Sequence, residues 1–192
     1  TKMETLQIPF DFSKRWNDKM IEVEIWNSKC QALAAEDSIN DWFCKALETD
    51  CRLVEMPETT HRLINEKFNK GNEIVSFADG YPFLIIAESS LEDLNSRLEN
   101  KLPMNRFRPN LVVKGAETFA EDNWKKIRIG KTIFRATKPC ARCVITTIDQ
   151  SNGEFNGKEP LKTLAAYRTA QRVFPDSFEK LDLNANAVLF GQ

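Results

Sequence analysis

Apolar and polar side chains follow two different periods along this chain, and each period predicts one kind of element. Residues 21–26, Ile-Glu-Val-Glu-Ile-Trp, alternate strictly, which predicts a strand with one buried and one solvated face. From Ser38 the apolar residues recur at helical spacing as far as Leu47, and Ser38 is expected to cap this helix. Residues 51–56 return to an extended pattern, which Pro57 ends. The first part of the chain is therefore expected to combine short strands with one amphipathic helix.

The rest of the chain contains shorter apolar runs separated by turn-forming residues. Residues 62–68 have a weak helical pattern, whereas residues 83–87 are apolar throughout, which predicts a buried strand. Ser89 or Ser90 is expected to open a helix that carries a stripe of leucines. Pro160 fits the first turn of a last helix. Further strands are predicted at residues 111–113, 127–129, 132–136 and 144–148.

The order of these elements predicts an α+β fold, because many short strands are interrupted by a few isolated helices without regular β-α-β alternation. The chain of 192 residues with 42% hydrophobic residues is long and apolar enough for one good-sized domain or two small ones. Pro103 and Pro109 interrupt the pattern, so a domain boundary is expected near residues 102–108.

The composition narrows the classes of partner and compartment. The 27 basic and 28 acidic residues leave a formal charge of -1, so nucleic acid is not an expected partner. No apolar run approaches the roughly 20 residues that a membrane-spanning helix needs, so no membrane span is expected in this stretch. The five cysteines are scattered and odd in number, which favours a reducing compartment over a disulfide framework. The cytoplasm is therefore the expected location.

Residues 140–143, Cys-Ala-Arg-Cys, are the first candidate for chemistry. A thiolate is a soft metal ligand, and a neighbouring cation such as Arg142 favours the deprotonated form of a thiol. A strand after Cys143 would hold its thiol at the end of a rigid element. The motif also has the C-x-x-C form of zinc and redox sites, but a second ligand pair and a following helix pattern are missing from the sequence. From spacing alone, two buried apolar cysteines are an equally good interpretation.

The segment Arg106-Phe107-Arg108 is a second candidate site. Its two guanidinium groups could bind an anion through paired hydrogen bonds. A solvated turn around a packed Phe107 is the alternative, and composition alone favours it. The sequence has neither a glycine-rich dinucleotide motif nor a P-loop, which counts against the common nucleotide-binding folds.

Several short motifs follow one another along most of the chain. They are Asp-Gly-Tyr-Pro at 79–82, Ser-Leu-Glu-Asp-Leu-Asn at 90–95, Arg-Phe-Arg-Pro-Asn at 106–110, Ala-Glu-Asp at 120–122 with Trp124, Cys-Ala-Arg-Cys at 140–143 with Thr-Thr-Ile-Asp at 146–149, Glu-Pro-Leu at 159–161 with Tyr-Arg at 167–168, and Leu-Phe-Gly-Gln at 189–192. Each motif is weak alone, but in this order they are specific. Together they resemble the MOSC family, most closely its two-part members such as the mitochondrial amidoxime-reducing component and its bacterial relatives.

This resemblance implies a fold and a domain arrangement. The fold would be a β-barrel-rich α+β MOSC fold with an N-terminal MOSC-associated portion of β-barrel and α/β structure. Residues 1–101 would form part of that N-terminal β-barrel with its α/β insert, and residues 102–192 would form the MOSC domain. Family members carry further strands beyond both ends of this sequence, so the chain is expected to be truncated at both ends, with the C-terminal strands missing.

The resemblance also implies a molybdenum cofactor site. In such a site a pterin dithiolene and one cysteine thiolate hold the metal, and Cys143 matches that cysteine by position. Arg108 matches an arginine that helps to bind the cofactor through its phosphate, and Asn110 and Arg142 match neighbouring motif positions with supporting roles. The fragment alone is expected to lack part of the cradle and so its Mo-molybdopterin. Pyridoxal phosphate binding is a further expectation that comes with the family.

The activity implied by the resemblance is that of an oxidoreductase. It would reduce small N-hydroxylated compounds, of the amidoxime or hydroxylamine type, by two electrons. An external donor protein would supply these electrons, either a cytochrome b5-type protein or a flavin or iron-sulfur reductase, because the chain contains no four-cysteine cluster motif of its own. The alternative is a non-catalytic carrier of molybdenum cofactor or sulfur on the same fold. An upstream anchor would place the protein at the mitochondrial outer membrane instead of the cytoplasm.

Overall fold

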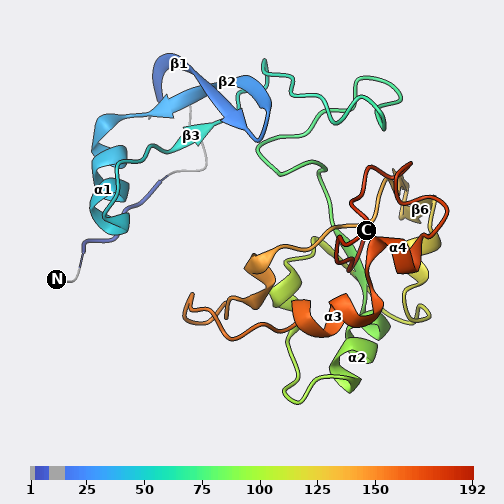
Figure 1. Cartoon of the computed structure of the whole chain (residues 1–192). Helices are drawn as coiled ribbons and strands as arrows, with labels where there is room; N and C mark the ends of the chain where they lie inside the picture. Colours follow the sequence, from blue (N-terminus) through green and yellow to red (C-terminus); the bar gives the residue numbers. More distant parts are fainter. Residues whose placement is uncertain (1–2, 9–15) are drawn as a thin grey trace. The chain divides into compact units, whose positions relative to one another are not determined.

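The computed structural model describes residues 3–8 and 16–192 of the chain. The chain divides into two compact units, Thr1–Pro82 and Phe83–Gln192 (Figure 1). Short strands and helices follow one another irregularly in both units, which confirms the predicted α+β class. The domain boundary expected near residues 102–108 stays a prediction. Within the described ranges, no helix combines the length and the apolar character needed to cross a bilayer.

The sheet of the first unit is antiparallel and is built from strands that follow one another in the chain. β1 (Trp16–Ile25) pairs with β2 (Ser28–Ala35), and β2 pairs with the short β3 (Val54–Glu55). The side chains from Ile21 to Ile25 are alternately half-buried and exposed, which confirms the strand predicted there. Trp26 has a φ of 54° and begins the tight turn that leads into β2. Local alternation therefore predicts this ribbon correctly.

Helix α1 (Asp37–Leu47) follows β2 and is anchored by Asn40. The Asn40 side chain donates to the carbonyl of Ala35 at 2.9 Å and accepts from the backbone N–H of Leu53 at 3.0 Å. The predicted N-cap at Ser38 is wrong, because the helix begins one residue earlier. The Ser38 hydroxyl instead donates to a glutamate side chain two residues before it, at 3.1 Å. A contact with the returning chain, rather than a serine cap, therefore fixes the start of the helix.

The long loop after β3 is organised by the buried guanidinium of Arg62. The helix predicted over residues 62–68 is wrong, and Leu63 pairs with Ile74 in an isolated antiparallel bridge instead. Arg62 is 6% exposed, and its side chain donates to three backbone carbonyls at 2.6 to 3.1 Å. These carbonyls belong to Ser76, Ala78 and Asp79. Because a buried cation needs such acceptors, this tertiary contact outweighs the weak local helix pattern.

The second unit contains β4 (Ile85–Ala87), a strand whose three residues are all buried. The buried strand predicted here is confirmed, although Phe83 is 53% exposed and the strand begins later than expected. β4 pairs in parallel with β5 (Leu111–Val113), which confirms another predicted strand. Helix α2 (Glu88–Ser96) lies between these strands in the chain and begins one residue before the serines expected to open it.

Segment 188–192 runs along β4 and approaches it closely. The backbone groups of Ile85 and Gln192 exchange two hydrogen bonds, at 2.7 and 3.0 Å. Gly191 has a φ of 79°, and a Cβ atom at this position would lie 2.6 Å from Cγ1 of Ile86 and 2.9 Å from the carbonyl oxygen of Ile85. Only glycine therefore fits here without displacing the strand.

The largest hydrophobic cluster of the second unit joins residues that are far apart in the sequence. Its fully buried members are Ile86, Leu94, Phe107, Leu164 and Phe190. The rings of Phe107 and Phe190 lie with their centroids 4.3 Å apart and their planes tilted by 31°. Contact between these rings brings the segment after α2 against the segment that runs along β4.

The remaining elements of the second unit are short. Helix α3 (Leu161–Tyr167) begins directly after Pro160, as the sequence predicts. The hairpin of β6 and β7 confirms two more predicted strands. The bounds are η2 (Met104–Phe107), η3 (Ala120–Asn123), β6 (Lys126–Ile129), β7 (Thr132–Arg135), η4 (Val144–Thr147) and α4 (Ala170–Val173).

A buried ion pair connects η3 with the end of α3. Arg168 is 5% exposed and donates from both terminal nitrogens to the two carboxylate oxygens of Asp122, at 2.7 and 2.8 Å. Its guanidinium also lies 4.0 Å from the ring centroid of Phe119. Next to this pair, the fully buried Glu121 accepts a hydrogen bond from the backbone N–H of Ala87 at 3.2 Å, directly before α2. These charged groups therefore fasten η3 to two helices.

Candidate functional site

Cys143 lies at the start of a tight turn and not at the start of a strand. The strand predicted over residues 144–148 is wrong, because η4 forms there and buries Thr146 and Thr147. The hydroxyls of these threonines donate to the carbonyls three residues earlier, at 3.0 and 2.8 Å, which favours the tight turn over an extended backbone. The thiol of Cys143 is exposed. It is therefore accessible to a ligand rather than buried in the hydrocarbon core.

The chain before Cys143 is held against segment 188–191. The backbone N–H groups of Cys140 and Arg142 donate to carbonyls of that segment at 2.9 and 2.7 Å. The carbonyl of Cys140 accepts from the same segment at 3.2 Å. Strand-like pairing, supplied by a distant part of the sequence, thus fixes the position of the residue next to the thiol.

Arg106 connects η2 with η4. It is 3% exposed and donates to the carbonyl of Thr146 at 3.5 Å and to Oδ2 of Asp149 at 3.4 Å. Hydrogen bonds from the backbone and side chain of Ser151 lower the pKa of Asp149 below its ordinary value, and the charge of Arg106 lowers this pKa further. The sequence grouped Arg106 with Arg108 as a possible anion binder. In the structure, Arg106 instead fastens the two turns to each other.

Arg108 and Asn110 follow η2 directly. Arg108 has a φ of 53°, and its backbone N–H donates to the carbonyl of Asn105 at 3.1 Å, so it closes the turn while its side chain is exposed. Asn110 accepts through its side-chain oxygen from the backbone N–H of Leu84 at 2.9 Å. Its own backbone N–H donates to the carbonyl of Leu84 at 2.9 Å. Asn110 therefore positions the chain that enters β4. Arg108 instead carries an exposed guanidinium on a turn whose backbone is fixed.

Arg142 joins the two segments that carry the predicted site residues. Its Nη2 donates to the carbonyl of Phe107 at 2.7 Å, and its Nη1 donates to the sulfur of Cys140 at 3.0 Å. The third donor, Nε, is enclosed and has no hydrogen-bond partner among the described residues. Because Phe107 precedes Arg108 and Arg142 precedes Cys143, these contacts bring the exposed cation and the exposed thiol onto neighbouring turns.

Sequence reasoning missed the residues that hold these turns together. Thr146 and Asp149 belong to a family-like motif, but no periodicity or spacing in the sequence indicates that Arg106 binds them. The sequence also gives no indication that the sulfur of Cys140 accepts a hydrogen bond from Arg142. The one available signal is that Arg106 lies between two prolines, Pro103 and Pro109. Its burial becomes known only from the fold.

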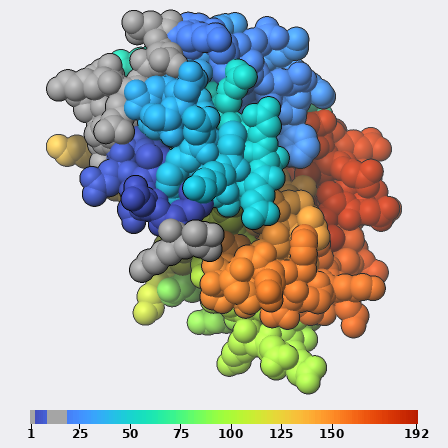
Figure 2. Space-filling view, turned by 90° about the vertical axis from the view of Figure 1, so that its left-hand side faces the viewer, coloured from blue at the N-terminus to red at the C-terminus, as the bar shows by residue number. Residues whose placement is uncertain are grey.

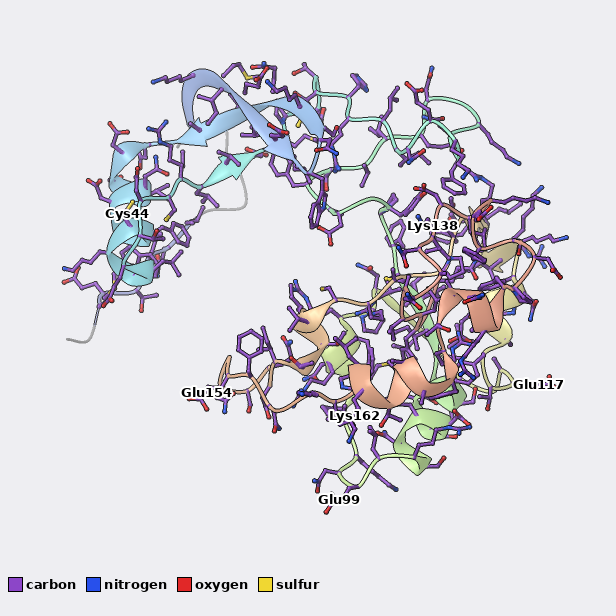
Figure 3. All side chains as sticks on the ribbon, in the orientation of Figure 1. Cys44, Glu99, Glu117, Lys138, Glu154 and Lys162 are labelled. Carbon is purple, nitrogen blue, oxygen red and sulfur yellow. The ribbon has the colours of Figure 1, made fainter. Side chains whose placement is uncertain are left out.

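A separate cleft of about 810 Å³ lies between α3 and the loop after α2. Its wall includes Glu99 in that loop and Lys162 on α3, both labelled in Figure 3, together with Tyr167. None of the four predicted site residues lines it. The exposed segment 150–158 contributes Asn156 to the wall of the cleft and forms part of the orange surface in Figure 2. The cleft is thus distinct from the turns around Cys143.

One family model and several known proteins are similar to this chain. The MOSC domain model matches residues 72–186, which is more than half of the chain. The mitochondrial amidoxime-reducing component 1 of Danio rerio is 36% identical over 173 residues, covering 87% of this chain and 52% of that protein. The protein of the same name from Homo sapiens is 42% identical over 118 residues, covering 62% of this chain and 33% of that protein. The molybdenum cofactor sulfurase of Oryza sativa is 36% identical over 163 residues, covering 77% of this chain and 20% of that protein.

The chain spans about half the length of the amidoxime-reducing components from Danio rerio and Xenopus laevis, at 52% and 55%. The matched range 72–186 includes both turns of the candidate site. Neither the family description nor these names mention pyridoxal phosphate, so binding of that cofactor stays a prediction. By the extent of the match, the chain belongs to the MOSC domain family.

Proposed function

We propose that this chain supplies the metal-binding cysteine of a molybdenum cofactor-dependent oxidoreductase. Cys143 would be the protein ligand to molybdenum, and Arg108 and Arg142 would bind the anionic part of the pterin cofactor, with Asn110 in a supporting role. One observation carries the proposal: an exposed thiol lies beside Arg142, which itself bonds the residue preceding Arg108.

The chemistry of these side chains fits the cofactor. A cysteine sulfur is a soft ligand that suits a sulfur-rich, redox-active metal centre. The guanidinium of Arg108 is exposed and matches the oxygen atoms of a phosphate, and the half-buried Arg142 adds a second positive charge. The two arginines come from the two turns that Arg106 holds together. When bound, the cofactor supplies two-electron redox chemistry at its metal, which amino acid side chains do not provide.

The residues of this chain have binding and positioning roles in that proposal. Cys143 holds the metal, while the hydroxyls of Thr146 and Thr147 keep its turn in shape. Arg106 and Asp149 keep this turn at a fixed place relative to η2. A fixed ligand geometry matters because catalysis at a metal depends on preorganised donors.

The proposed reaction is the reduction of a small N-hydroxylated compound such as an amidoxime. The N–O bond breaks, two electrons and two protons are taken up, and the products are the N–H compound and water. An external donor protein, of the cytochrome b5 type or a flavin or iron-sulfur reductase, would supply the electrons. The relatives named amidoxime-reducing components, at up to 42% identity, favour this substrate class.

A carrier of molybdenum cofactor or sulfur is the second candidate function. The match to a molybdenum cofactor sulfurase at 36% identity favours it, and an exposed thiol can also hold a transferable sulfur atom. Both candidates assign the same cysteine, so they differ in turnover and not in the residues involved.

The compartment is also part of the proposal. All five cysteines are free thiols, which suits a reducing compartment such as the cytoplasm. The word mitochondrial in the names of several relatives favours the alternative, the mitochondrial outer membrane, which would require an anchor upstream of these residues.

The decisive experiment measures molybdenum content and benzamidoxime reduction in the full-length protein that contains these residues. Reduced methyl viologen serves as the electron donor, so no natural partner is needed. An enzyme binds molybdenum and forms benzamidine with turnover, whereas a carrier binds the cofactor or a persulfide without reducing benzamidoxime. Protein that contains neither molybdenum nor a persulfide after expression in a cofactor-producing host contradicts both candidates.

A pair of arginine variants tests the cofactor contact itself. Arg108→Ala removes the exposed cation beside the thiol and should lower the molybdenum retained during gel filtration by about tenfold. Arg172→Ala is the matched control, because Arg172 is an exposed arginine on α4. Equal retention by both variants would remove Arg108 from the site.

A further inference from the structure

Cys44 and Cys51 contact each other in the first unit, away from the residues proposed to hold the cofactor. Cys44 lies in the C-terminal half of α1, where Figure 3 labels it. Its sulfur accepts from the backbone N–H of Cys51 at 3.4 Å and donates to the carbonyl of Cys51 at 3.2 Å. Both thiols are free and partly buried. One sulfur therefore lies against the backbone of the other cysteine.

The end of α1 places these residues together. Glu48 has a φ of 51° and reverses the chain, and Thr49 donates its N–H to the carbonyl of Cys44 at 3.3 Å. Beyond the reversal, Leu53 is fixed because its N–H donates to the side chain of Asn40 at 3.0 Å. Both sides of the short loop are thus anchored in the same helix, which keeps Cys51 beside Cys44.

The surroundings of Cys51 make its thiol harder to ionise. Burial raises the pKa of Cys51 above its ordinary value of 9.0, and a hydrogen bond with Cys44 and the charges of Cys44 and Asp50 raise it further. A raised pKa leaves little thiolate at neutral pH, which makes Cys51 a poorer attacking thiol. Because the Cys44 thiol in turn donates to the carbonyl of Cys51 and lies 4.0 Å from Oδ1 of Asp50, the first attack on an incoming disulfide is open to either cysteine.

A metal site is the competing interpretation of two adjacent cysteines. Among residues 3–8 and 16–192, no group of three His, Cys, Asp or Glu side chains is placed to hold a metal ion. Full burial, which would make the thiols inert, is also not observed for either cysteine. Contact between one partly accessible thiol and the backbone of a second partly accessible cysteine instead favours thiol-disulfide chemistry.

We propose that Cys44 and Cys51 form a reversible dithiol site that reacts with low-molecular-weight disulfides such as glutathione disulfide. The thiolate of one cysteine attacks one sulfur of glutathione disulfide, so a mixed disulfide forms and one glutathione thiolate leaves and takes up a proton. The other cysteine then loses its proton and attacks the protein sulfur of the mixed disulfide, and the second glutathione leaves as a thiolate and takes up a proton. Two protein thiols are oxidised by two electrons to one disulfide, and one glutathione disulfide is reduced to two glutathione molecules.

The product would link the C-terminal half of α1 to the segment that leads into β3. This link closes a small ring around the left-handed turn at Glu48. It would hold the end of α1 against the sheet under oxidising conditions and release it when the disulfide is reduced. The site is independent of the proposed cofactor function, because no step of that function uses Cys44 or Cys51.

Peptide mapping tests this site directly. The full-length protein is equilibrated in glutathione buffers of different ratio, acid-quenched, alkylated and digested with trypsin. Cleavage after Lys45 separates Cys44 from Cys51, so a disulfide between them joins peptide 30–45 to peptide 46–52. The linked pair is the expected product, and Cys44→Ser and Cys51→Ser should abolish it. Cys30→Ser, in the same tryptic peptide as Cys44, is the matched control and should retain it.

The effective concentration of the two thiols distinguishes a preorganised dithiol site from a chance contact. In the folded protein the equilibrium constant for the linked pair should exceed that of the urea-unfolded chain by about tenfold or more. Equal constants in the two states would overturn the proposal. A link from Cys51 to Cys30, or a mixed disulfide that never closes, would overturn it as well.

Discussion

The two cysteine pairs of this chain differ in what surrounds each sulfur atom. Only two residues separate Cys140 from Cys143, yet the Cys140 sulfur accepts a hydrogen bond from Arg142 at 3.0 Å while the Cys143 thiol is exposed. Six residues separate Cys44 from Cys51, yet the Cys44 sulfur lies 3.2 Å from the carbonyl oxygen of Cys51. Separation along the chain therefore does not decide which cysteines can act together.

The backbone between the cysteines explains the difference. Residues 140–142 pair in an extended conformation with segment 188–191, and extended backbone points side chains an odd number of positions apart to opposite faces. The chain between Cys44 and Cys51 instead reverses at the left-handed residue Glu48. The extended segment gives each sulfur different surroundings, whereas the reversed segment places the sulfur of one cysteine against the backbone of the other.

The largest expected effect separates Cys140 from Cys143. Cys143→Ser should lower the molybdenum content of the full-length protein by about 100-fold, because it removes the proposed soft ligand. Cys140→Ser should retain molybdenum, because a serine oxygen can still accept from Arg142. The measurement is elemental analysis of both purified variants. Equal loss in the two variants would favour a C-x-x-C site in which both cysteines bind one metal.

Gly191→Ala tests whether the close approach of segment 188–192 to β4 stabilises the second unit. The new Cβ atom would lie 2.6 Å from Cγ1 of Ile86 in a backbone with a φ of 79°, so unfolding should become easier by about 2 to 4 kcal/mol. Gly153→Ala is the control, because Gly153 also has a positive φ of 77° but no neighbour within 4 Å, and it should cost only about 1 kcal/mol.

Urea titration of both glycine variants measures this difference. Formation of the Cys44–Cys51 disulfide should stay unchanged in both, because the two cysteines belong to the other compact unit. Equal destabilisation by the two alanines would mean that the close approach to β4 does not matter.

A smaller effect is expected for Arg106→Ala. This change leaves the carbonyl of Thr146 without its buried donor, and such a loss costs about 1 to 3 kcal/mol. Arg108→Ala should change stability by less than about 0.5 kcal/mol, because Arg108 is exposed. Thermal unfolding of the two variants checks the contrast. A larger effect for Arg108 would reverse the roles assigned to the two arginines.

The smallest expected effect is a shift in the titration of Cys51. Its rate of alkylation by iodoacetamide, followed in peptide 46–52, should rise with a midpoint above pH 9.0. Cys44→Ser removes the charge and the thiol hydrogen bond that raise this pKa, so the midpoint should move down toward 9.0. An unchanged midpoint would mean that burial alone perturbs Cys51, and that the two thiols do not interact.

The sequence predicts those parts of the fold that depend on local patterns. The strand over residues 21–25 and the helix after Pro160 follow from alternation and from helix-start chemistry. The strand predicted over residues 144–148 fails because two threonine hydroxyls bond carbonyls three residues earlier, and the helix predicted over residues 62–68 fails because distant partners decide the backbone. In the second case that partner set is a loop whose carbonyls surround the guanidinium of Arg62.

The candidate site is predictable to a similar degree. Motif order indicated Arg108, Arg142 and Cys143, and the structure places all three on two linked turns. It also shows Asn110 bonded to the start of β4, a role that spacing does not reveal. The contact of Cys44 with Cys51, equally, depends on a positive φ at a glutamate, for which the sequence carries no signal.

Molybdenum K-edge X-ray absorption of the full-length protein tests the central claim most directly, because it counts the sulfur atoms bound to the metal. A pterin dithiolene contributes two sulfur atoms, so the account predicts one additional sulfur from Cys143 in the natural protein and its loss in Cys143→Ser. A natural protein that binds molybdenum through the dithiolene sulfurs alone would contradict the assignment of Cys143 as the metal ligand.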